Sequence, residues 1–447
     1  MVMSDRIDKL RKRLLSTEAQ KPSRGVSRLW KTGRSAAGMA AAVLGGRLQG
    51  HGHGLEAADL DAVVRLVERL GELKGVAMKA GQILGYVDPS LSPELRGLFS
   101  VLQTASPASP FTEVERTIRE AFGQRADELL AGLERAPIAV ASIGQVHRAT
   151  LPKGLDVAVK VRHAGIEAAL ASDFKAAGVG GAIASAMFSV AGGSVRSFVD
   201  EARTALLEEC DYPLEAARQN EFARLFAGDP EIIIPTVVLE WCGPGVLTTD
   251  WRPGHGLEAW LATAPPPTAR NRLGEALFRF YVGTLYRHGL LHADPHPGNY
   301  GVQDDGRVVI YDFGCVRQFD AATVRAFAAL VSAVRDDDLS AMAHALHTLG
   351  ASPGPKMDDH LRRLLRGFFE PLLVAGPKRI KPDEGIEARQ VMQDKRAIMR
   401  LALPGKLLFL FRLRFGLYAV LARIEAEADW ARLESTWADD ALARTLP

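Results

Sequence analysis

A short polar segment restricts the possible folds of this chain more than any other feature, because it fixes the spacing of three side chains that could carry the chemistry of one site. Residues 292–299 read HADPHPGN, and residues 308–314 read VVIYDFG, in which a β-branched run leads into an acidic residue. Two prolines in the first stretch exclude a regular helix there. Asp294, Asn299 and Asp312 carry the oxygens that hold Mg²⁺ and orient an acceptor in phosphoryl transfer. The segment therefore predicts a loop and a strand that supply these three groups.

The spacing of these residues is typical of a kinase catalytic loop and the metal-binding tripeptide that follows it. Asn299 lies five positions after Asp294, and Asp312 lies eighteen positions after Asp294, at the end of a predicted strand. A zinc site made from His292 and His296 is not expected, because the prolines break the helix that would put both imidazoles on one face. We expect His292 to orient the backbone around the catalytic aspartate and His296 to pack or to meet phosphate.

A lysine in an apolar strand supplies the cation that such a site needs. Lys160 lies in residues 156–163 (DVAVKVRH), which form a predicted β-hairpin with the strand before the turn at residues 152–154. A single lysine on a half-buried strand is usually an exposed edge residue, but beside a small-residue loop and the two aspartates it is expected to contact the α- and β-phosphates of a nucleotide. The sequence offers three carboxylates that could pair with it: Glu209, Asp211 and Glu215.

Strand and helix patterns follow one another in the order of a bilobed fold. A second β-hairpin is predicted to join residues 232–241 to residues 245–251. Helical patterns cover residues 55–86, 110–133, 166–226 and 268–288, and most of the last 125 residues. This order predicts an α+β, bilobed, protein-kinase-like fold with a small β-containing N-lobe, a mainly helical C-lobe and an N-terminal helical extension.

Four motifs, in one order along the chain, make it resemble the UbiB-like atypical kinase family, whose protein-kinase-like members are linked to ubiquinone biosynthesis. These are a Lys-x-Gly-Gln signature at residues 79–82, an alanine-rich nucleotide loop at residues 139–147, a Glu-x-Asp signature at residues 209–211, and the two segments described above. The resemblance covers roughly residues 70–330. The chain departs from the family pattern at Val140, which stands in the middle of the usual alanine run.

The resemblance implies a role for each motif residue. ATP or ADP is expected to bind Lys160 and the nucleotide loop, which comprises Ala139, Val140, Ala141, Ser142, Ile143 and Gly144. Lys160 is implied to contact the phosphates and to pair with Glu215. Asp294 becomes the catalytic carboxylate, and Asn299 and Asp312 become the Mg²⁺ ligands.

The Lys-x-Gly-Gln signature is implied to change which acceptors can reach the site. In this family its helix folds over the active site, so Lys79 should point at Glu209 and Asp211 and block the groove that holds a peptide in protein kinases. The residues after Asp312 support this expectation, because no Ala-Pro-Glu motif and no long activation segment precede the next helical tract. Phosphorylation of other proteins is therefore disfavoured.

The patterns and the resemblance together divide the chain into five predicted parts. These are a basic N-terminal extension over residues 1–54, a helical extension with the Lys-x-Gly-Gln signature over residues 55–135, a kinase-like N-lobe over residues 136–250, a kinase-like C-lobe over residues 251–400 and a C-terminal helical segment over residues 401–447.

Composition and charge restrict the partners. With 55 Lys and Arg against 53 Asp and Glu, the chain gives no reason to expect nucleic acid. Residues 1–50 hold eleven Lys and Arg against three Asp and Glu, which makes this basic end a candidate for peripheral contact with the inner face of a membrane. Three widely spaced cysteines predict neither a disulfide framework nor a zinc site, and no signal-peptide pattern is present, so a cytoplasmic location is expected.

Three uncharged or apolar stretches are not expected to span a bilayer. Residues 35–46 are too few, and residues 176–195 are mostly Ala, Gly and Ser, which insert weakly. Residues 407–424 are interrupted by three arginines and are predicted to form a buried or membrane-apposed helix.

Three functions fit these observations. The leading one is an ATP- and Mg²⁺-dependent atypical kinase or ATPase that acts on or with a small lipid-like or phenolic molecule and supports quinone biosynthesis. A small-molecule phosphotransferase of the aminoglycoside or choline kinase type has a similar catalytic loop, but it lacks the motifs at residues 79–82 and 209–211. A nucleotide-binding scaffold with little turnover is the third.

Overall fold

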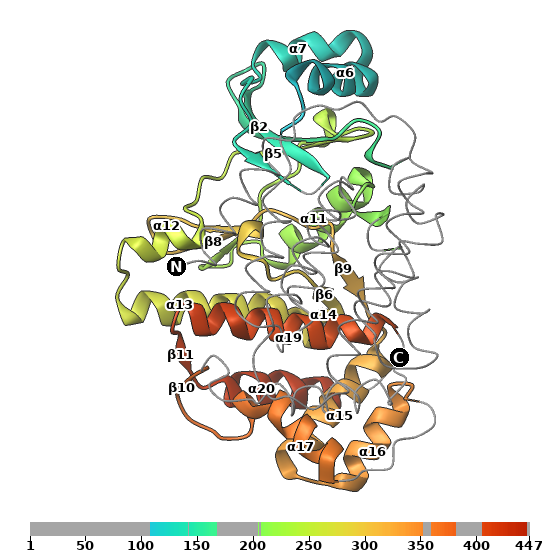
Figure 1. The fold of residues 1–447 in the computed structure, drawn as a ribbon, viewed down its shortest axis with the longest axis vertical. Coiled ribbons are helices and arrows are strands. Elements are labelled where there is room, and N and C mark those ends of the chain that lie inside the picture. The colour runs from blue at the N-terminus through green and yellow to red at the C-terminus, as the bar shows by residue number, and fades with distance from the viewer. Residues whose placement is uncertain are drawn as a thin grey trace, which may run out of the picture. The chain divides into compact units, whose positions relative to one another are not determined.

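The computed structural model describes residues 108–141, 143–167, 204, 207–351, 359–380 and 405–444. The chain divides into two compact units (Figure 1). The first unit comprises Met1–Pro213 and Val238–Asp250, and the second comprises Leu214–Val237 and Trp251–Pro447. The helices predicted over residues 55–86 and over the first part of residues 166–226 lie outside the described residues.

An antiparallel sheet with the strand order β1-β2-β3-β5 is the centre of the first unit. The strands are β1 (Ala139–Val140), β2 (Gly144–Thr150), β3 (Asp156–Arg162) and β5 (Val246–Asp250). Alternate residues of β3 point to opposite faces, so its three valines are buried in the core while Lys160 is half-buried on the other face. The predicted hairpin is confirmed, and its turn has positive φ at Lys153 and Gly154.

Two helices complete the core of the first unit. They are α6 (Phe111–Phe122) and α7 (Ala126–Ala131), which appear with β2 and β5 at the top of Figure 1. The helical prediction for residues 110–133 is confirmed, except that the first helix ends before Gly123. The φ of Gly123 is 56°, a conformation that favours glycine. The helices and strands bury one apolar cluster, whose members include Val114, Ile118, Leu129, Val157, Val159, Trp241 and Val246.

The second predicted hairpin is wrong. Only Ile232–Ile233 form a strand (β4) in its first half, and β4 pairs in parallel with β8 (Val308–Ile310) of the second unit. Pro235, which cannot donate a ladder hydrogen bond, follows this strand. Leu239–Trp241 form a 3₁₀ turn. β5 pairs with β3 instead.

The second unit is mainly helical, as predicted. Its helices are α11 (Tyr212–Leu225, whose first two residues belong to the first unit), α12 (Leu257–Ala262), α13 (Pro267–Phe278), α14 (Thr284–His288), α15 (Ala321–Asp336), α16 (Leu339–Thr348), α17 (Asp359–Phe368), α19 (Gly405–Arg423) and α20 (Trp430–Ala443). α13 runs into α14 through a π-helical turn over Arg279–Gly283. α15 packs against α16 and α20.

Short strands of the second unit hold the polar segments. β4 and β8 form a sheet with β7 (Tyr300–Val302), while β6 (Leu290–His292) pairs with β9 (Val316–Gln318), and β10 (Lys378–Arg379) pairs with β11 (Glu427–Ala428). The predicted strand before Asp312 is confirmed as β8. β6, β7 and β9 were not predicted, because three residues are too few to show a period.

The apolar C-terminal stretch forms the buried helix α19. Leu410, Leu413, Leu417 and Leu421 are all buried. Among the described residues, the helices are too short or too polar to cross a bilayer.

A buried charge network holds α19 against its neighbours. The Arg414 guanidinium forms a two-pronged ion pair with Glu434 of α20, and both side chains are at most 3% exposed. The Tyr286 hydroxyl of α14 donates to Glu434 at 2.6 Å, and the guanidinium lies 5.4 Å and 4.9 Å from the ring centres of Phe327 and Phe369. Burial and the nearby carboxylate raise the pKa of Tyr286. The network thus joins three helices around two charges removed from water.

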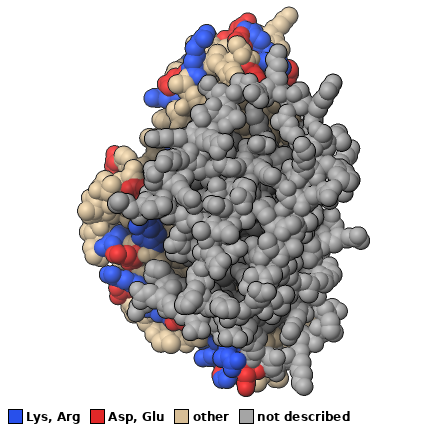
Figure 2. All heavy atoms as spheres, viewed as in Figure 1, with Lys and Arg blue, Asp and Glu red and all other residues tan. Residues whose placement is uncertain are grey.

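Other ion pairs lie at the surface, between side chains that are exposed to solvent. In the view of Figure 2, Lys and Arg lie beside Asp and Glu on the described part of this face. Arg423 at the end of α19 pairs with Glu258 at 2.6 Å, and both side chains are more than half exposed. Such pairs contribute less than about 1 kcal/mol.

We predict that Arg414→Met lowers the free energy of unfolding by about 3–5 kcal/mol, because it leaves the Glu434 carboxylate buried without its cation. Arg423→Met is the matched control, since it removes an exposed pair from the same helix. Urea unfolding followed by the fluorescence of Trp430 and Trp437 on α20 measures both. Equal losses of unfolding free energy in the two variants would show that the buried pair contributes no more to stability than the exposed one.

Candidate active site

The loop of residues 293–299 begins at a strand pair in the second unit. β6 ends at His292, and the Ala293 amide donates to the Cys315 carbonyl at 2.8 Å, which extends the β6–β9 pairing by one residue. Asp294 follows and is 8% exposed. The Tyr281 hydroxyl donates to the Asp294 carbonyl at 3.3 Å. The backbone around the predicted catalytic carboxylate is therefore held from two sides.

The β7–β8 hairpin places the two predicted metal ligands at the same end. Tyr300 of β7 lies opposite Ile310 of β8, and the next pair outward is joined by the Tyr311 amide, which donates to the Asn299 carbonyl at 2.8 Å. Asp312 is the next residue along the chain. The Asn299 side-chain amide donates to the Asp294 carbonyl at 3.2 Å. The structure thus brings Asp294, Asn299 and Asp312 together, while their individual roles stay predictions.

The oxygen atoms at this end fit a magnesium ion held jointly with phosphates. Since the Asn299 nitrogen is used by the Asp294 carbonyl, its amide oxygen is the atom left for a metal. Asp312 adds a carboxylate whose Oδ1 accepts from the Gly314 amide at 3.0 Å, which fixes its orientation. Mg²⁺ typically takes one or two protein oxygens and completes its shell with phosphate and water. No group of three His, Cys, Asp or Glu side chains suited to a metal occurs among the described residues, so a zinc-type site is not found there.

His292 connects the two halves of this site. Its Nε2 lies 2.6 Å from the Asp312 carbonyl, which can only accept, so Nε2 carries the hydrogen. Its Nδ1 then accepts from the Asp294 amide at 3.4 Å. The expectation that His292 orients the backbone around the aspartate agrees with this geometry. His296, by contrast, accepts from the Gly298 amide at 2.9 Å and caps its own turn.

Aromatic rings enclose His292 completely. The rings of Phe280 and Tyr281 from the π-helical turn lie 5.4 Å and 5.3 Å from the imidazole, and those of Phe313 and Phe222 lie 5.5 Å and 6.3 Å from it. Burial lowers the pKa of His292, so it is a neutral donor at physiological pH. Sequence reasoning missed Phe222 and Phe280, because only packing brings these helical residues to the loop.

Helix α11 contacts the backbone next to Asp312. The Glu215 carboxylate, 1% exposed, accepts from the Phe313 amide at 3.4 Å, and Arg218 donates to the Gly314 carbonyl at 3.0 Å. Glu215 therefore has a role in the second unit that the sequence did not predict. Its pairing with Lys160 stays a prediction, since Lys160 belongs to the first unit.

In the first unit, the nucleotide loop and Lys160 meet the Glu-x-Asp segment. The loop connects β1 to β2, and the Ala141 amide donates to the Gly144 carbonyl at 2.7 Å. A side chain at Gly144 would lie 2.5 Å from the Tyr212 hydroxyl, so only glycine fits. The Lys160 Nζ lies 5.2 Å from the centre of the Tyr212 ring. Tyr212, which directly follows the motif, was not among the predicted residues.

A second basic residue of β3 holds the motif itself. Arg162 donates to the Cys210 carbonyl at 2.7 Å, between Glu209, which is buried, and Asp211, which is exposed. Burial raises the pKa of the Cys210 thiol to about 11, which makes it a poor nucleophile. The alternation of β3 puts Lys160 and Arg162 on one face, a signal that could have identified Arg162 from the sequence.

Two predicted residues cannot be placed in this way. Lys79 and Ser142 lie outside the described residues.

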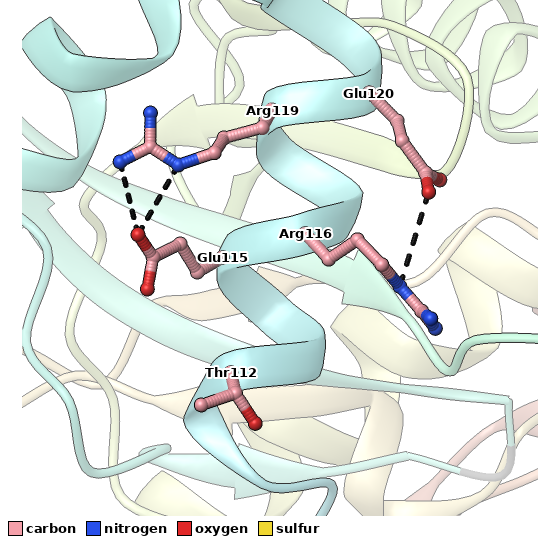
Figure 3. Close-up of a pocket in the computed structure, with 5 residues that line it drawn as sticks. All are labelled: Thr112, Glu115, Arg116, Arg119 and Glu120. Atoms are coloured by element: carbon pink, nitrogen blue, oxygen red, sulfur yellow. Dashed lines mark hydrogen bonds and ion pairs between the residues drawn. The ribbon is translucent and has the colours of Figure 1, made fainter.

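A shallow hollow on α6 is not a second candidate. Figure 3 shows its five lining residues, Thr112, Glu115, Arg116, Arg119 and Glu120, along one helix. The two arginines already pair with the two glutamates one turn away, at 2.9 Å and 3.8 Å. The hollow therefore offers little uncompensated charge to a ligand.

Comparison with known proteins gives one family and one fold. Residues 101–346 match the model of the ABC1 atypical kinase-like domain. The protein named atypical kinase COQ8B, mitochondrial, of Rattus norvegicus is 30% identical over 72% of this chain and 62% of its own length. The chloroplastic protein ACTIVITY OF BC1 COMPLEX KINASE 8 of Arabidopsis thaliana is 33% identical over 56% of this chain and 33% of its own length. The chain thus spans about a third to three fifths of these relatives.

A solved structure shares the fold over most of both chains. It is the complex of Rv3197 with erythromycin from Mycobacterium tuberculosis, with a TM-score of 0.58 and 25% identity. The match covers 86% of this chain and 97% of that one.

We predict that His292→Phe lowers the free energy of unfolding by about 2–4 kcal/mol, because the Asp312 carbonyl and the Asp294 amide each lose a buried partner while the ring volume is kept. Amide hydrogen exchange at residues 293–299 should also accelerate. His288→Phe, on the exposed end of α14, is the control and should change stability by less than about 0.5 kcal/mol. Loop exchange at the wild-type rate in His292→Phe would contradict the bridging role.

Proposed function

The chain belongs to the ABC1 atypical kinase-like family, and from that premise we propose that it is an ATP- and Mg²⁺-dependent atypical kinase or ATPase. We further propose that it acts on or with a small lipid-like or phenolic molecule and supports quinone biosynthesis. One observation carries the catalytic part of the proposal: at one end of β7 and β8 the Asn299 side chain donates to the Asp294 carbonyl, and the amide of Tyr311, next to Asp312, donates to the Asn299 carbonyl.

The residues of the second unit divide the work as follows. Asp294 orients the acceptor hydroxyl or water and takes its proton, and its buried position reduces competition from solvent. Asn299 and Asp312 offer the two protein oxygens for the metal. Mg²⁺ with ATP, when bound, supplies the transferable phosphoryl group and neutralises the charge that develops on it. Because His292 fixes both backbone segments, the carboxylates need little reorganisation during the reaction.

The first unit contributes the nucleotide loop and a cation. Lys160 is proposed to contact the phosphates, with the Tyr212 ring beneath its ammonium group. The small residues of the loop allow backbone amides to approach phosphate. Lys79 is proposed to point at Glu209 and Asp211 and to exclude a peptide acceptor.

The choice of acceptor rests on the motifs and on one relative. A family with the Lys-x-Gly-Gln signature is not expected to admit a peptide, which leaves a small molecule. The structural neighbour was solved with erythromycin, a bulky amphipathic ligand, which supports a lipid-like class over a small sugar or choline. The basic residues 1–50 supply a means of peripheral contact with anionic lipid.

We predict that Asp312→Asn lowers Mg²⁺-dependent ATP turnover at least about 100-fold, because it removes the only full negative charge among the two proposed metal ligands. Turnover is measured on purified protein with and without anionic liposomes and a phenolic quinone-precursor mimic. Asp305→Asn, in the exposed β7–β8 turn, is the matched control. A turnover that depends on Asp312 and rises with lipid or phenol supports the proposal. Tight nucleotide binding without any Asp312-dependent turnover would instead indicate a scaffold.

We predict that Lys160→Met weakens nucleotide binding about tenfold or more, because phosphate loses a charge-assisted hydrogen bond. The control is Lys153→Met, which removes an exposed lysine from the turn of the same hairpin. Titration with a fluorescent ADP analogue measures both affinities. Unchanged affinity in Lys160→Met would remove this residue from the site.

A further inference from the structure

Two polar side chains of β2, next to the nucleotide loop, are buried and have no part in the proposed reaction. Gln145 and His147 are 1% and 0% exposed. They are two residues apart on a strand, so both point to the same face. The ring of Phe111 on α6 meets the His147 ring edge-on at 6.1 Å. Buried polar groups are costly unless they are hydrogen-bonded, so their partners identify what they hold.

The hydrogen bonds of these side chains form a continuous relay. The Ser109 amide donates to Gln145 Oε1 at 2.6 Å, and Gln145 Nε2 donates to the Ser109 carbonyl at 3.3 Å. The same nitrogen lies 2.9 Å from His147 Nε2. At the far end, His147 Nδ1 lies 2.7 Å from the Glu134 carbonyl. The relay therefore links the residue two positions before α6 to the residue three positions after α7.

Only one arrangement of hydrogens satisfies the relay. The Glu134 carbonyl accepts, so His147 Nδ1 must donate and Nε2 must accept from the Gln145 amide. A protonated His147 would face Gln145 with a second N–H, and a flipped Gln145 would present its NH₂ to the Ser109 amide. Burial lowers the pKa of His147, which keeps it neutral. Of the charges around it, the exposed Glu134 carboxylate favours the protonated form, and the Arg135 guanidinium lies 4.9 Å from the centre of the Phe111 ring.

Ser109 is also linked to the nucleotide loop through His163. Its Oγ lies 2.9 Å from His163 Nδ1, just beyond β3. The His163 amide donates to the Ile143 carbonyl at 2.9 Å, and Ile143 is a residue of the loop. Ser109 thus uses its amide and carbonyl to contact Gln145, which follows the loop, and its hydroxyl to contact His163, which is bonded to the loop residue Ile143.

We propose that Gln145 and His147 are positioning residues that hold the nucleotide loop in its binding conformation through Ser109. The proposal rests on the proposed nucleotide binding. If the relay is intact, the loop is already fixed before the nucleotide arrives, and binding costs less conformational entropy. If Ser109 shifts, Gln145 and His163 lose a constraint together, and with them the end of the loop that enters β2.

Three variants with one control test the proposal. Gln145→Met removes every hydrogen bond of that side chain at similar volume, and His147→Asn keeps a donor for the Glu134 carbonyl but loses the contact with Gln145. Ser109→Ala removes only the contact with His163. Arg148→Met is the matched control. Arg148 follows His147 on β2, and its side chain forms an exposed ion pair with Asp156 outside the relay.

Two readouts separate positioning from a merely structural role. The first is hydrogen exchange of the amides of residues 139–144 in the nucleotide-free protein. The second is the dissociation constant for a fluorescent ADP analogue, compared with kcat. We expect about tenfold faster loop exchange and about five- to tenfold weaker binding in Gln145→Met and His147→Asn, with kcat within twofold. Ser109→Ala should show about two- to threefold changes, and Arg148→Met none.

The outcomes are distinct. Variants that fold and melt at a lower temperature, but keep wild-type loop exchange and nucleotide affinity, would overturn the proposal, because the relay would then serve the core alone. If the wild-type protein binds no nucleotide, the proposed function fails, while loop exchange still decides whether the relay fixes the loop. Nitrogen NMR of His147 adds a direct check: the Nδ1–H tautomer should dominate in the wild type and persist in Gln145→Met, because the Glu134 carbonyl still accepts from Nδ1, while the Nε2 resonance should shift as it loses the Gln145 donor.

Discussion

The geometry of the candidate active site depends on two hydrogen bonds of the neutral His292 imidazole. One nitrogen donates to the Asp312 carbonyl and the other accepts from the Asp294 amide, so a single rigid ring sets the distance between two loops that are eighteen residues apart. The ring can do this only because aromatic side chains exclude water and keep it uncharged. Glu215 and Arg218 then add contacts to the backbone of residues 313–314. The backbone at both carboxylates is thus fixed by contacts of its own amides and carbonyls.

The two units use buried polar groups in different ways. In the second unit, the Arg414–Glu434 pair joins α14, α19 and α20. Its two residues are distant in sequence from the loops of residues 293–299 and 311–315, and it contributes to the stability of the fold. In the first unit, Gln145 and His147 are neutral and lie beside the nucleotide loop, so their desolvation costs less and their hydrogen bonds fix orientation. Each network is fully directional, because each has donors and acceptors that fit in one arrangement.

Spacing and strand alternation predicted the fold class, the first hairpin and the grouping of Asp294, Asn299 and Asp312, because those signals are local in sequence. The second hairpin failed because β4 finds its partner in β8, some seventy-five residues away, and no local pattern distinguishes parallel from hairpin pairing. Tyr212 and Phe222 were missed for the same reason, since each acts through a neighbour brought to it by packing, whereas the alternation of β3 could have identified Arg162. The role of Gln145 could not be predicted, because its partner Ser109 lies thirty-six residues earlier.

The π-helical turn at Arg279–Gly283 has a consequence for how this protein can change over evolution. A π turn holds one more residue than an α turn, and here the extra residue lets the consecutive side chains of Phe280 and Tyr281 both face His292. Deleting one residue would restore a regular helix at no cost to its backbone bonding, but it would rotate one of the two rings away from the imidazole. A regular helix and the ring contacts of His292 therefore require different numbers of residues at this turn. The number of residues in this stretch suits the contacts of the histidine rather than the regularity of the helix.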